Sequence, residues 1–508
     1  MNNRPTIIPL SEPILKLESW STMQEAGAKI RHAQADWKSR CVDQRLAILR
    51  VFREKVAAEP LSLLRAVSSA RPAAEMLSAE ILPLLDACRF LEKNGRRLLK
   101  PRKLGRRGRP IWLFGHSAEV QRVDWGVVLI IAPANYPILL PGVQLLQALT
   151  AGNGVLLKPG PGGSAAARAI VRLLEASGLP ADLVEILSED KDAGRMALYR
   201  DADKVFFTGS AVTGSRILQE LAPQLVPSAM ELSGSDAMVV LEDADLHLSA
   251  KALSFGLHLN QGQICIAPRR IFVAASRLQE FLQVVRTAFQ ERECFALPLR
   301  RIAGFLPHLG DALDNGATLV AGSDMTEGEP RFPFVVSNVP RDSALWSEDF
   351  FLPVAAVAPF ETEQDLLTGL KQSPYALGAS IFTADCDAAK ALATKLKVGV
   401  ISINDLIVPT ADPRLPFGGR GRSGFGVTRG AEGLLEMTAV KVVTTRSFKW
   451  RPHYAEPQSG DGDLFAHFLQ LVHSGSWKQR FSSAIKLFRL GASRRRPSSH
   501  ARNILKMD

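Results

Sequence analysis

A single cysteine, Cys265, occurs in a sequence context that can present a thiol for chemistry. The run Asn260–Arg269 reads NQGQICIAPR, and Gly262 lets the backbone turn tightly just before the thiol. A thiol becomes a nucleophile when it is partly ionised, which requires a nearby base or a favourable dipole. The alternative is an inert cysteine in the core, which is the usual place for a free thiol.

An acid amid apolar neighbours, Glu231, lies upstream of this cysteine at the edge of a strand-like run. Burying a carboxylate is unfavourable unless it has a partner or takes part in proton transfer. Glu231 is therefore either a general base near a reacting centre or a surface residue in a salt bridge.

Two further turns carry groups that can bind a ligand. The run Phe206–Gly214 reads FFTGSAVTG and lies between a predicted strand and a predicted helix, where backbone N–H groups can approach a phosphate. It lacks the GxGxxG pattern of the usual dinucleotide fold, so it is a weak signal by itself. The run Pro133–Pro137 reads PANYP and holds Asn135 after a buried strand. This asparagine is either a turn former or an amide donor to a developing oxyanion.

The ordered set of motifs resembles the aldehyde dehydrogenase superfamily in its NAD(P)-dependent, non-acylating form. The likeness spans residues 25–446, with eight motifs in the family's order and spacing. They are PANYP at 133–137, GNGVLLKP at 152–159, FTGS at 207–210 with Gly214, ELSG at 231–234, NQGQIC at 260–265, EDFFLPV at 348–354, GVISIN at 399–404, and PFGG at 416–419 running to SGFG at 423–426.

The resemblance implies a covalent mechanism and a nicotinamide cofactor, NAD or NADP, without a metal. Cys265 would attack an aldehyde, with the Asn135 amide and the Cys265 backbone N–H holding the oxyanion. Hydride transfer would leave a thioester, and Glu231 would activate the water that releases a carboxylic acid. The residues carried over to cofactor binding are Lys158 at the adenosine ribose, Gly209 and Ser210 by the pyrophosphate and nicotinamide, Asp349 at the nicotinamide ribose, and Gly214, Phe351 and Pro133 as further contacts.

Several positions depart from the family pattern. Pro161 replaces the acid that usually holds a ribose hydroxyl, which leaves room for the 2′-phosphate of NADP. Asp349 stands where a glutamate is usual, Leu352 replaces a glycine, and Ser233 and Ser235 replace a glycine and a lysine.

These departures leave two interpretations: an active enzyme with a retuned cofactor site, or a degenerate member acting as a scaffold. A CoA-linked acyl reductase or acylating dehydrogenase on the same fold is a further alternative. The presence of Glu231 argues against it, because CoA-dependent relatives need no water activator.

Short apolar runs alternate with helical patterns from Val123 onward, which predicts an α/β protein with parallel sheets covered on both faces. One of the helices is predicted to be capped by Ser164 and closed by Gly178. The resemblance also implies a homodimer or homotetramer that pairs through an arm. The expected domains are a Rossmann-like NAD(P)-binding domain at 1–105 and 125–232, a second α/β catalytic domain at 233–426, a small β oligomerisation arm at 106–124 and 427–446, and a basic amphipathic tail at 447–508.

The net charge of +11 is concentrated in two segments, and the rest of the chain is slightly acidic. Residues 94–110 hold eight Lys or Arg and no acid, and residues 447–508 hold eleven Lys or Arg against four acids. Apolar stripes in this tail, such as Trp477, Phe481, Ile485 and Phe488, predict amphipathic helices. Such helices contact an anionic membrane, or they pack on the body or on a second subunit. The run Arg494–Arg496 lacks an accompanying aromatic motif, so no nucleic-acid partner is expected.

Five scattered cysteines without CxxC spacing argue against a zinc site or a disulfide framework. They favour a reducing, cytoplasmic setting. The segment Met1–Pro13 has no apolar stretch typical of a signal peptide. The most hydrophobic run, Gly126–Ala134, is too short to span a membrane.

Overall fold

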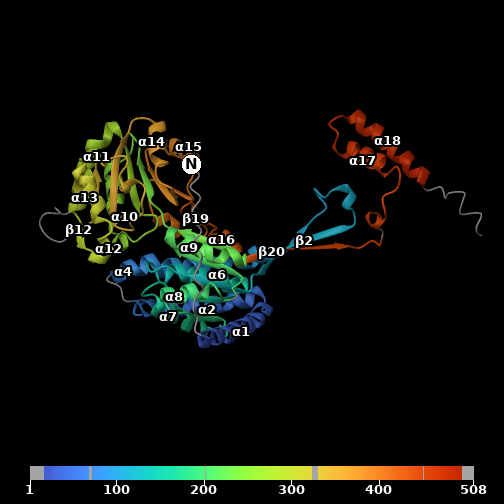
Figure 1. Ribbon diagram of the computed structural model, residues 1–508, viewed down its shortest axis with the longest axis horizontal. Helices are drawn as coiled ribbons and strands as arrows, with labels where there is room; N and C mark the ends of the chain where they lie inside the picture. The colour runs from blue at the N-terminus through green and yellow to red at the C-terminus, as the bar shows by residue number, and fades with distance from the viewer. Residues whose placement is uncertain (1–16, 68–70, 201, 323–329, 450, 495–508) are drawn as a thin grey trace, which may run out of the picture. The chain divides into compact units, whose positions relative to one another are not determined.

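The computed structural model describes residues 17–67, 71–200, 202–322, 330–449 and 451–494. The predictions made for Met1–Pro13 and for the last two residues of Arg494–Arg496 lie outside this part. The chain divides into two compact units, each with its own internal contacts (Figure 1). The larger unit comprises Met1–Leu104 with Glu119–Val443, and the smaller comprises Gly105–Ala118 with Thr444–Asp508.

A six-stranded sheet forms the first half of the larger unit. Its central strand, β3 (Val127–Ile131), is buried along its whole length and pairs in parallel with a strand on either side. Because successive side chains alternate between faces, Val128 and Ile130 enter one hydrophobic cluster, whereas Val127 and Leu129 enter another. The sheet has the order β19 (Gly424–Phe425), β7 (Ser228–Leu232), β6 (Lys204–Gly209), β3, β4 (Gly154–Lys158) and β5 (Val184–Ile186), with only β19 antiparallel.

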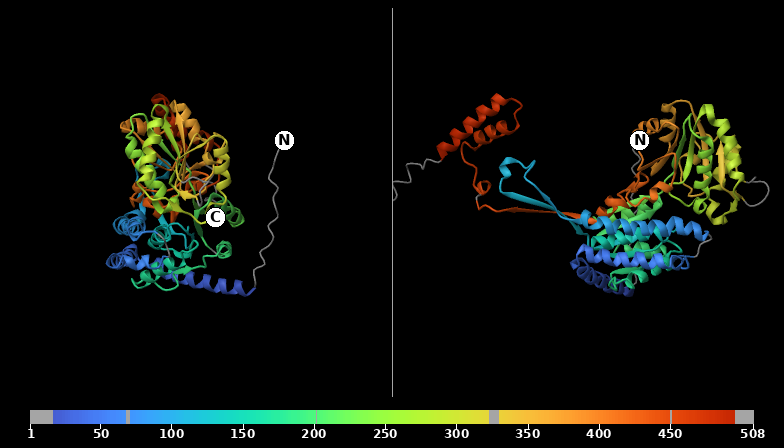
Figure 2. Two further views of the ribbon diagram at one scale, coloured as in Figure 1. Left: turned by 90° about the vertical axis from the view of Figure 1, so that its left-hand side faces the viewer. Right: turned by 180° about the vertical axis from the view of Figure 1, so that it is seen from behind.

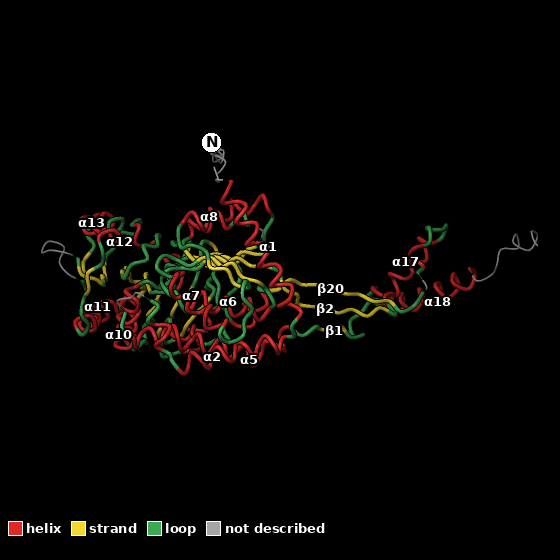
Figure 3. The backbone as a smooth tube through the Cα atoms, turned by 90° about the horizontal axis from the view of Figure 1, so that it is seen from below, coloured by secondary structure: helices red, strands yellow, loops and turns green. Residues whose placement is uncertain are grey.

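Helices cover both faces of this sheet, as Figure 3 shows from below. One face carries α1 (Leu17–Ser39), α8 (Lys191–Ala197) and α9 (Ala211–Leu221). The other face carries α2 (Val42–Ala58), α3 (Leu61–Leu64), α5 (Leu82–Leu99), α6 (Leu139–Ala151) and α7 (Ser164–Glu175). A short helix α4 (Ala73–Met76) continues through one π-helical turn, Leu77–Ile81, into α5.

A seven-stranded sheet forms the second half of the larger unit. Along β8 (Asp236–Val240), Ala237 and Val239 face one helical layer, whereas Met238 and Val240 face the other. The strand order of the whole sheet is β11-β13-β14-β9-β8-β16-β17. The strands besides β8 are β11 (Thr318–Ala321), β13 (Phe334–Ser337), β14 (Val354–Phe360), β9 (Pro268–Ala274), β16 (Gly378–Phe382) and β17 (Val400–Ile403). All neighbours are parallel except β11 with β13.

Two layers of helices enclose the second sheet (Figure 1). Helices α10 (Leu246–His258) and α11 (Leu278–Gln290) pack on one face. Helices α13 (Leu306–Asp314), α14 (Glu363–Leu370) and α15 (Cys386–Ala393) pack on the other. The remaining elements are α12 (Leu299–Ile302), α16 (Gly430–Glu436), and two small antiparallel ladders that pair β10 (Phe295–Ala296) with β12 (Arg331–Phe332) and β15 (Tyr375–Ala376) with β18 (Arg420–Gly421).

Three strands form a separate sheet in the order β1 (Arg102–Leu104), β2 (His116–Asp124) and β20 (Thr438–Arg446). In the smaller unit, α17 (Asp461–His473) and α18 (Trp477–Arg494) lie side by side, as Figure 2 shows from behind. Among the described residues, no helix has the length and apolar composition needed to cross a membrane.

The predicted α/β class and parallel sheets are confirmed, but the predicted cap at Ser164 is wrong. Helix α7 begins at Ser164 itself, and Gly163 occupies the capping position. The Ser164 backbone N–H donates to Glu189 Oε2 at 3.1 Å, so a carboxylate from another loop satisfies this helix end. The prediction failed because that carboxylate is distant in sequence.

Candidate active site

The thiol of Cys265 follows a turn with an uncommon backbone conformation. Asn260, Gln261 and Gly262 all have positive φ, at 48°, 51° and 68°. A Cβ atom on Gly262 would lie 2.6 Å from the backbone of Pro353, so only glycine fits there. Two consecutive non-glycine residues in the left-handed region are unfavourable, and the surrounding contacts must hold them.

Hydrogen bonds tie this turn to the turn that carries Asn135. Asn260 Nδ2 donates to the Asn135 carbonyl at 2.9 Å, and Asn135 Nδ2 donates to the Gln263 carbonyl at 2.8 Å. A primary amide carries two N–H donors, and the Gln263 carbonyl takes one of those on Asn135. The structure thus brings Asn135 beside the cysteine turn, as the sequence predicted.

The cysteine opens into a cavity of about 410 Å³. Cys265 and Asn135 both line it. Most of its wall is apolar, with Ala79, Pro83, Tyr136, Leu139, Leu140, Phe255, Leu259, Ile264, Ile266, Ile407, Val408, Ala411 and Phe417. Its ionisable groups, besides the thiol and Tyr136, come from Glu75, His258, Arg292 and Arg429. This cavity can therefore accept a largely apolar molecule in contact with the thiol.

The carboxylate of Glu231 is buried on β7, close to this thiol. Glu231 Oε2 accepts a hydrogen bond from Thr428 Oγ1 at 2.9 Å, and Oε1 has no hydrogen-bond partner among the described residues. Burial raises the pKa of Glu231 above its usual range, against the opposing charge of Arg429. A carboxyl group with a raised pKa and one free oxygen is suited to take a proton from water.

The same environment controls Cys265. Burial raises the pKa of the Cys265 thiol, and the negative charges of Glu231 and Asp236 raise it further. The guanidinium of Arg429 acts in the opposite direction. Because like charges at short range disfavour simultaneous ionisation, the thiol ionises most readily while Glu231 is neutral.

Two residues near this pair were missed by the sequence analysis. Arg429 lines the cavity, donates to the Thr410 carbonyl at 2.9 Å, and lies 5.0 Å from the centre of the Phe417 ring. Thr428, directly before it, holds Glu231. Both lie a few residues after the last family-like motif, at 423–426. This proximity to a motif was the only sequence signal that could have identified them as site residues.

Two buried charges behind the cysteine turn were also missed. Arg269 donates to the carbonyls of Leu352 and Gly262, the latter at 2.6 Å, and burial lowers its pKa to about 10. Asp236 accepts the Gly378 N–H at 3.0 Å, and burial raises its pKa to about 7. Arg269 ends the NQGQICIAPR run and could have been noticed there. Asp236 has no sequence signal.

The predicted cofactor residues fall into two groups, and all of them lie outside the cavity that Cys265 lines. Lys158 and Gly209 end strands β4 and β6, so both lie at the carboxyl edge of the first sheet. Ser210 caps the eleven-residue helix α9 by accepting the Thr213 N–H at 3.2 Å. Gly214, within α9, packs on Leu232 of β7. Ser210 is exposed, so this helix start is open to a phosphate.

The lysine of this group has an acidic neighbour that the sequence analysis did not identify. Lys158 Nζ donates to the Glu189 carbonyl at 2.8 Å. The Glu189 carboxylate accepts the Ser164 N–H, and hydrogen bonds from Ser164 lower the pKa of Glu189. A carboxylate therefore lies near Lys158 although Pro161 has replaced the expected acid.

Asp349 and Phe351 lie in the segment before β14, whereas Pro133 follows β3 and lies beside Lys158 at the carboxyl edge of the first sheet. Asp349 Oδ1 accepts the Phe351 N–H at 2.9 Å, and Phe351 has a positive φ of 52°. Burial raises the pKa of Asp349, with Arg269 opposing it. Pro133 follows β3 and lies against Gly160, where a Cβ atom would meet the Pro133 backbone.

The chain is similar to proteins of one family over most of its length. The model of the aldehyde dehydrogenase family matches residues 15–443. A 4,4'-diapolycopene aldehyde oxidase of Methylomonas sp is 31% identical over 478 residues, covering 92% of this chain and 88% of the relative. A Mycobacterium tuberculosis protein assigned as an NADP(+) succinate-semialdehyde dehydrogenase is 30% identical over 458 residues, covering 86% of each chain.

A solved structure extends the likeness to three dimensions. The M. tuberculosis aldehyde dehydrogenase in complex with NAD+ is 25% identical and superposes with a TM-score of 0.76, covering 83% of this chain and 90% of the other.

Coupling between the thiol and the carboxylate is testable by alkylation. Replacing Glu231 by Gln removes a negative charge from beside Cys265, so its thiol should ionise at lower pH, by on the order of one pH unit. The rate of iodoacetamide labelling at Cys265, followed by peptide mass spectrometry against pH, measures this. The exposed Cys41 is the internal reference. Identical profiles in the wild type and Glu231→Gln would show that the two groups are not coupled.

Proposed function

The chain belongs to the aldehyde dehydrogenase family, and on that premise we propose that it oxidises an apolar aldehyde to the acid, with Cys265 as nucleophile and Glu231 as hydrolytic base. The enzyme is an aldehyde dehydrogenase that uses NAD or NADP. The observation that carries the proposal is the convergence of a cavity-lining thiol, a buried carboxyl with one free oxygen, and an amide donor.

The first chemical step joins the thiol to the substrate. Cys265 Sγ attacks the aldehyde carbon, a C–S bond forms, and the carbonyl electrons move to oxygen. The second N–H of Asn135 and the Cys265 backbone N–H stabilise that oxyanion. Loss of hydride, which a bound nicotinamide would accept, would re-form the carbonyl and leave a thioester on Cys265.

The second step releases the acid. Glu231 Oε1 takes a proton from water, and the resulting hydroxide attacks the thioester carbon. The C–S bond then breaks, the carboxylic acid leaves, and the thiolate returns. Thr428 holds the other carboxyl oxygen and so orients Glu231 for this transfer.

The residues at the carboxyl edge of the first sheet fit a nicotinamide dinucleotide. The exposed start of α9 at Ser210 would bind the pyrophosphate, and Lys158, at the end of β4, would contact the adenosine ribose. The nicotinamide half would be held by Asp349, by Phe351 and by the further contacts predicted at Gly214 and Pro133. When bound, the nicotinamide supplies the hydride acceptor. The domain limits expected from the sequence, with cofactor binding at 125–232 and catalysis at 233–426, are retained in this proposal.

An apolar substrate is supported by the wall of the cavity, where carbon-rich side chains outnumber charged ones. One relative is named as a 4,4'-diapolycopene aldehyde oxidase. Retention of Glu231 favours hydrolysis over transfer to CoA. Retention of Cys265, Glu231 and Asn135 in one place favours activity over a scaffold role.

We propose that the chain self-associates and resides in the cytoplasm. Val440 and Val442 on β20 expose more than half of their surface, and a second copy pairing there would cover them. We therefore retain the homodimer or homotetramer. All five cysteines are free, which favours the reducing cytoplasm.

The tail is a second functional element, which we propose binds an anionic membrane surface without crossing it. In α18, Trp477, Phe481 and Phe488 are 73%, 64% and 79% exposed. Lys478, Arg480, Lys486 and Arg489 alternate with them. Aromatic rings interleaved with cations suit the boundary between lipid headgroups and acyl chains. Packing on the body or on a second subunit is the competing interpretation.

Substitution of the catalytic pair tests the mechanism. Cys265→Ala should abolish NAD(P)H formation, because the nucleophile is gone. Glu231→Gln should slow turnover about 10²–10⁴-fold and accumulate a thioester. Absorbance of the reduced nicotinamide, with NAD and NADP in parallel, and intact mass of the protein measure these effects. Cys386→Ala, at an exposed thiol, is the control and should retain activity. Full turnover by Cys265→Ala would refute the mechanism.

Substrate chain length tests the apolar cavity. Along a series of linear aldehydes, kcat/KM should rise by up to about fourfold per added methylene until the cavity is filled. Steady-state kinetics over the series measure this, and an aldehyde carrying a terminal carboxylate is the polar comparison. A preference for that charged aldehyde over its apolar counterpart of equal length would contradict the proposal.

Vesicle sedimentation tests the tail. The full chain should bind vesicles containing phosphatidylserine and bind poorly to pure phosphatidylcholine. The triple variant Trp477→Ser, Phe481→Ser, Phe488→Ser should lose binding but keep turnover of a short soluble aldehyde. Equal sedimentation of both proteins, or a change in subunit number by light scattering in the variant, would favour the competing interpretation.

A further inference from the structure

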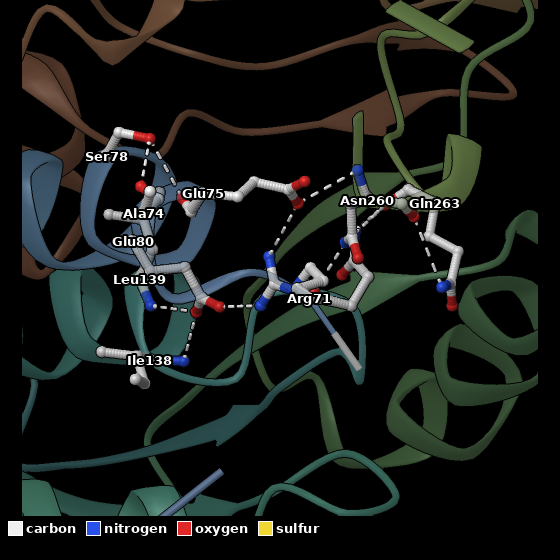
Figure 4. Close-up of polar contacts among 10 residues, drawn as sticks. Arg71, Ala74, Glu75, Ser78, Glu80, Ile138, Leu139, Asn260 and Gln263 are labelled. Atoms are coloured by element: carbon white, nitrogen blue, oxygen red, sulfur yellow. Dashed lines mark hydrogen bonds and ion pairs between the residues drawn. The ribbon is translucent and has the colours of Figure 1, made fainter. Parts of the chain in front are cut away.

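A charged cluster ahead of the catalytic turns is not used in the mechanism above. Figure 4 shows Arg71 between two carboxylates, Glu75 and Glu80. Glu75 belongs to α4 and Glu80 to the π-helical turn that follows it. Uncommon π-turns inside helices often occur at functional sites.

The Glu75 side of the cluster contacts the cysteine turn. Glu75 Oε1 accepts the Asn260 backbone N–H at 3.2 Å. Asn260 is the first residue of the left-handed turn before Cys265. Its N–H donates to a carboxylate that is 185 residues away in the chain, so only the tertiary fold brings the two groups together.

The Glu80 side of the cluster holds the Asn135 turn. Glu80 is fully buried, and its Oε2 accepts the N–H groups of Ile138 at 2.8 Å and Leu139 at 3.2 Å. These are the free donors at the start of α6. Arg71 donates to Glu80 and lies 5.2 Å from the centre of the Tyr136 ring, so it contacts both the turn and the acid that caps it.

We propose that Glu75 is a positioning residue, which fixes the turn before Cys265 in register with the Asn135 turn through Arg71 and Glu80. The inference rests on the proposed function, since it assigns Cys265 and Asn135 to one reacting centre. Two left-handed residues need external contacts to persist, and the Glu75 hydrogen bond is one that a side-chain change can remove. Burial raises the pKa of Glu75, and Arg71 and the Asn260 N–H oppose that rise. These two contacts therefore stabilise the charged form of the partly buried carboxyl group.

The test compares Glu75→Ala with Glu75→Gln. Removing the acceptor should let the turn relax, and kcat should fall on the order of tenfold or more because the thiol is displaced from its attack position. The rate of Cys265 alkylation, relative to Cys41, should change with it. Glu75→Gln keeps an oxygen acceptor and should restore both. Glu54→Ala, an exposed glutamate on α2, is the matched control.

Four results would overturn the inference. The first is an unchanged kcat and alkylation rate in Glu75→Ala, and the second is a change in KM alone in that variant. The third is a Glu75→Gln variant as impaired as Glu75→Ala. The fourth is a Glu75→Ala variant that loses kcat and also becomes labelled at the buried Cys88. The last would mean that the whole fold had loosened. The alkylation assay needs no turnover. A wild-type chain without NAD(P)H formation would therefore refute the proposed function and still leave Glu75 testable.

Discussion

Desolvation of two acids beside one apolar cavity is the constraint on which the site depends. Cys265 and Glu231 both have raised pKa values because burial disfavours their charged forms, and the charge of Glu231 raises the pKa of Cys265 further. Arg429 is the cation that opposes both effects. A neutral Glu231 favours thiolate formation, and an ionised Glu231 is needed to activate water. The two roles therefore suit successive stages of one reaction.

The scaffold meets this constraint with parts that are far apart in the chain. Glu231 lies near the end of β7 in the first sheet, and Cys265 precedes β9 of the second. The turn before the cysteine is held by backbone acceptors and side chains from several elements, among them Asn135 and Arg269. These contacts fix the position of the turn, which is what pre-organisation of a nucleophile requires.

The tail differs from the body in how much apolar side-chain surface it leaves exposed. The body buries its apolar side chains between sheets and helices, whereas α18 leaves large aromatic rings exposed between cations. A pair of helices cannot enclose that much apolar surface by itself. The proposal that the tail binds a membrane surface rests on this exposed aromatic and cationic face.

The sequence by itself predicted the α/β class with parallel sheets and the amphipathic tail, and it singled out Cys265, Glu231 and Asn135, because periodicity and motif order are local properties of the chain. Tertiary structure alone decided that Glu189 caps α7, that Thr428 and Arg429 complete the carboxylate site, and that Glu75 contacts Asn260. Each of these contacts joins residues whose separation in the chain carries no periodic signal. Only the packing of the two sheets and their helices brings such groups within hydrogen-bond distance.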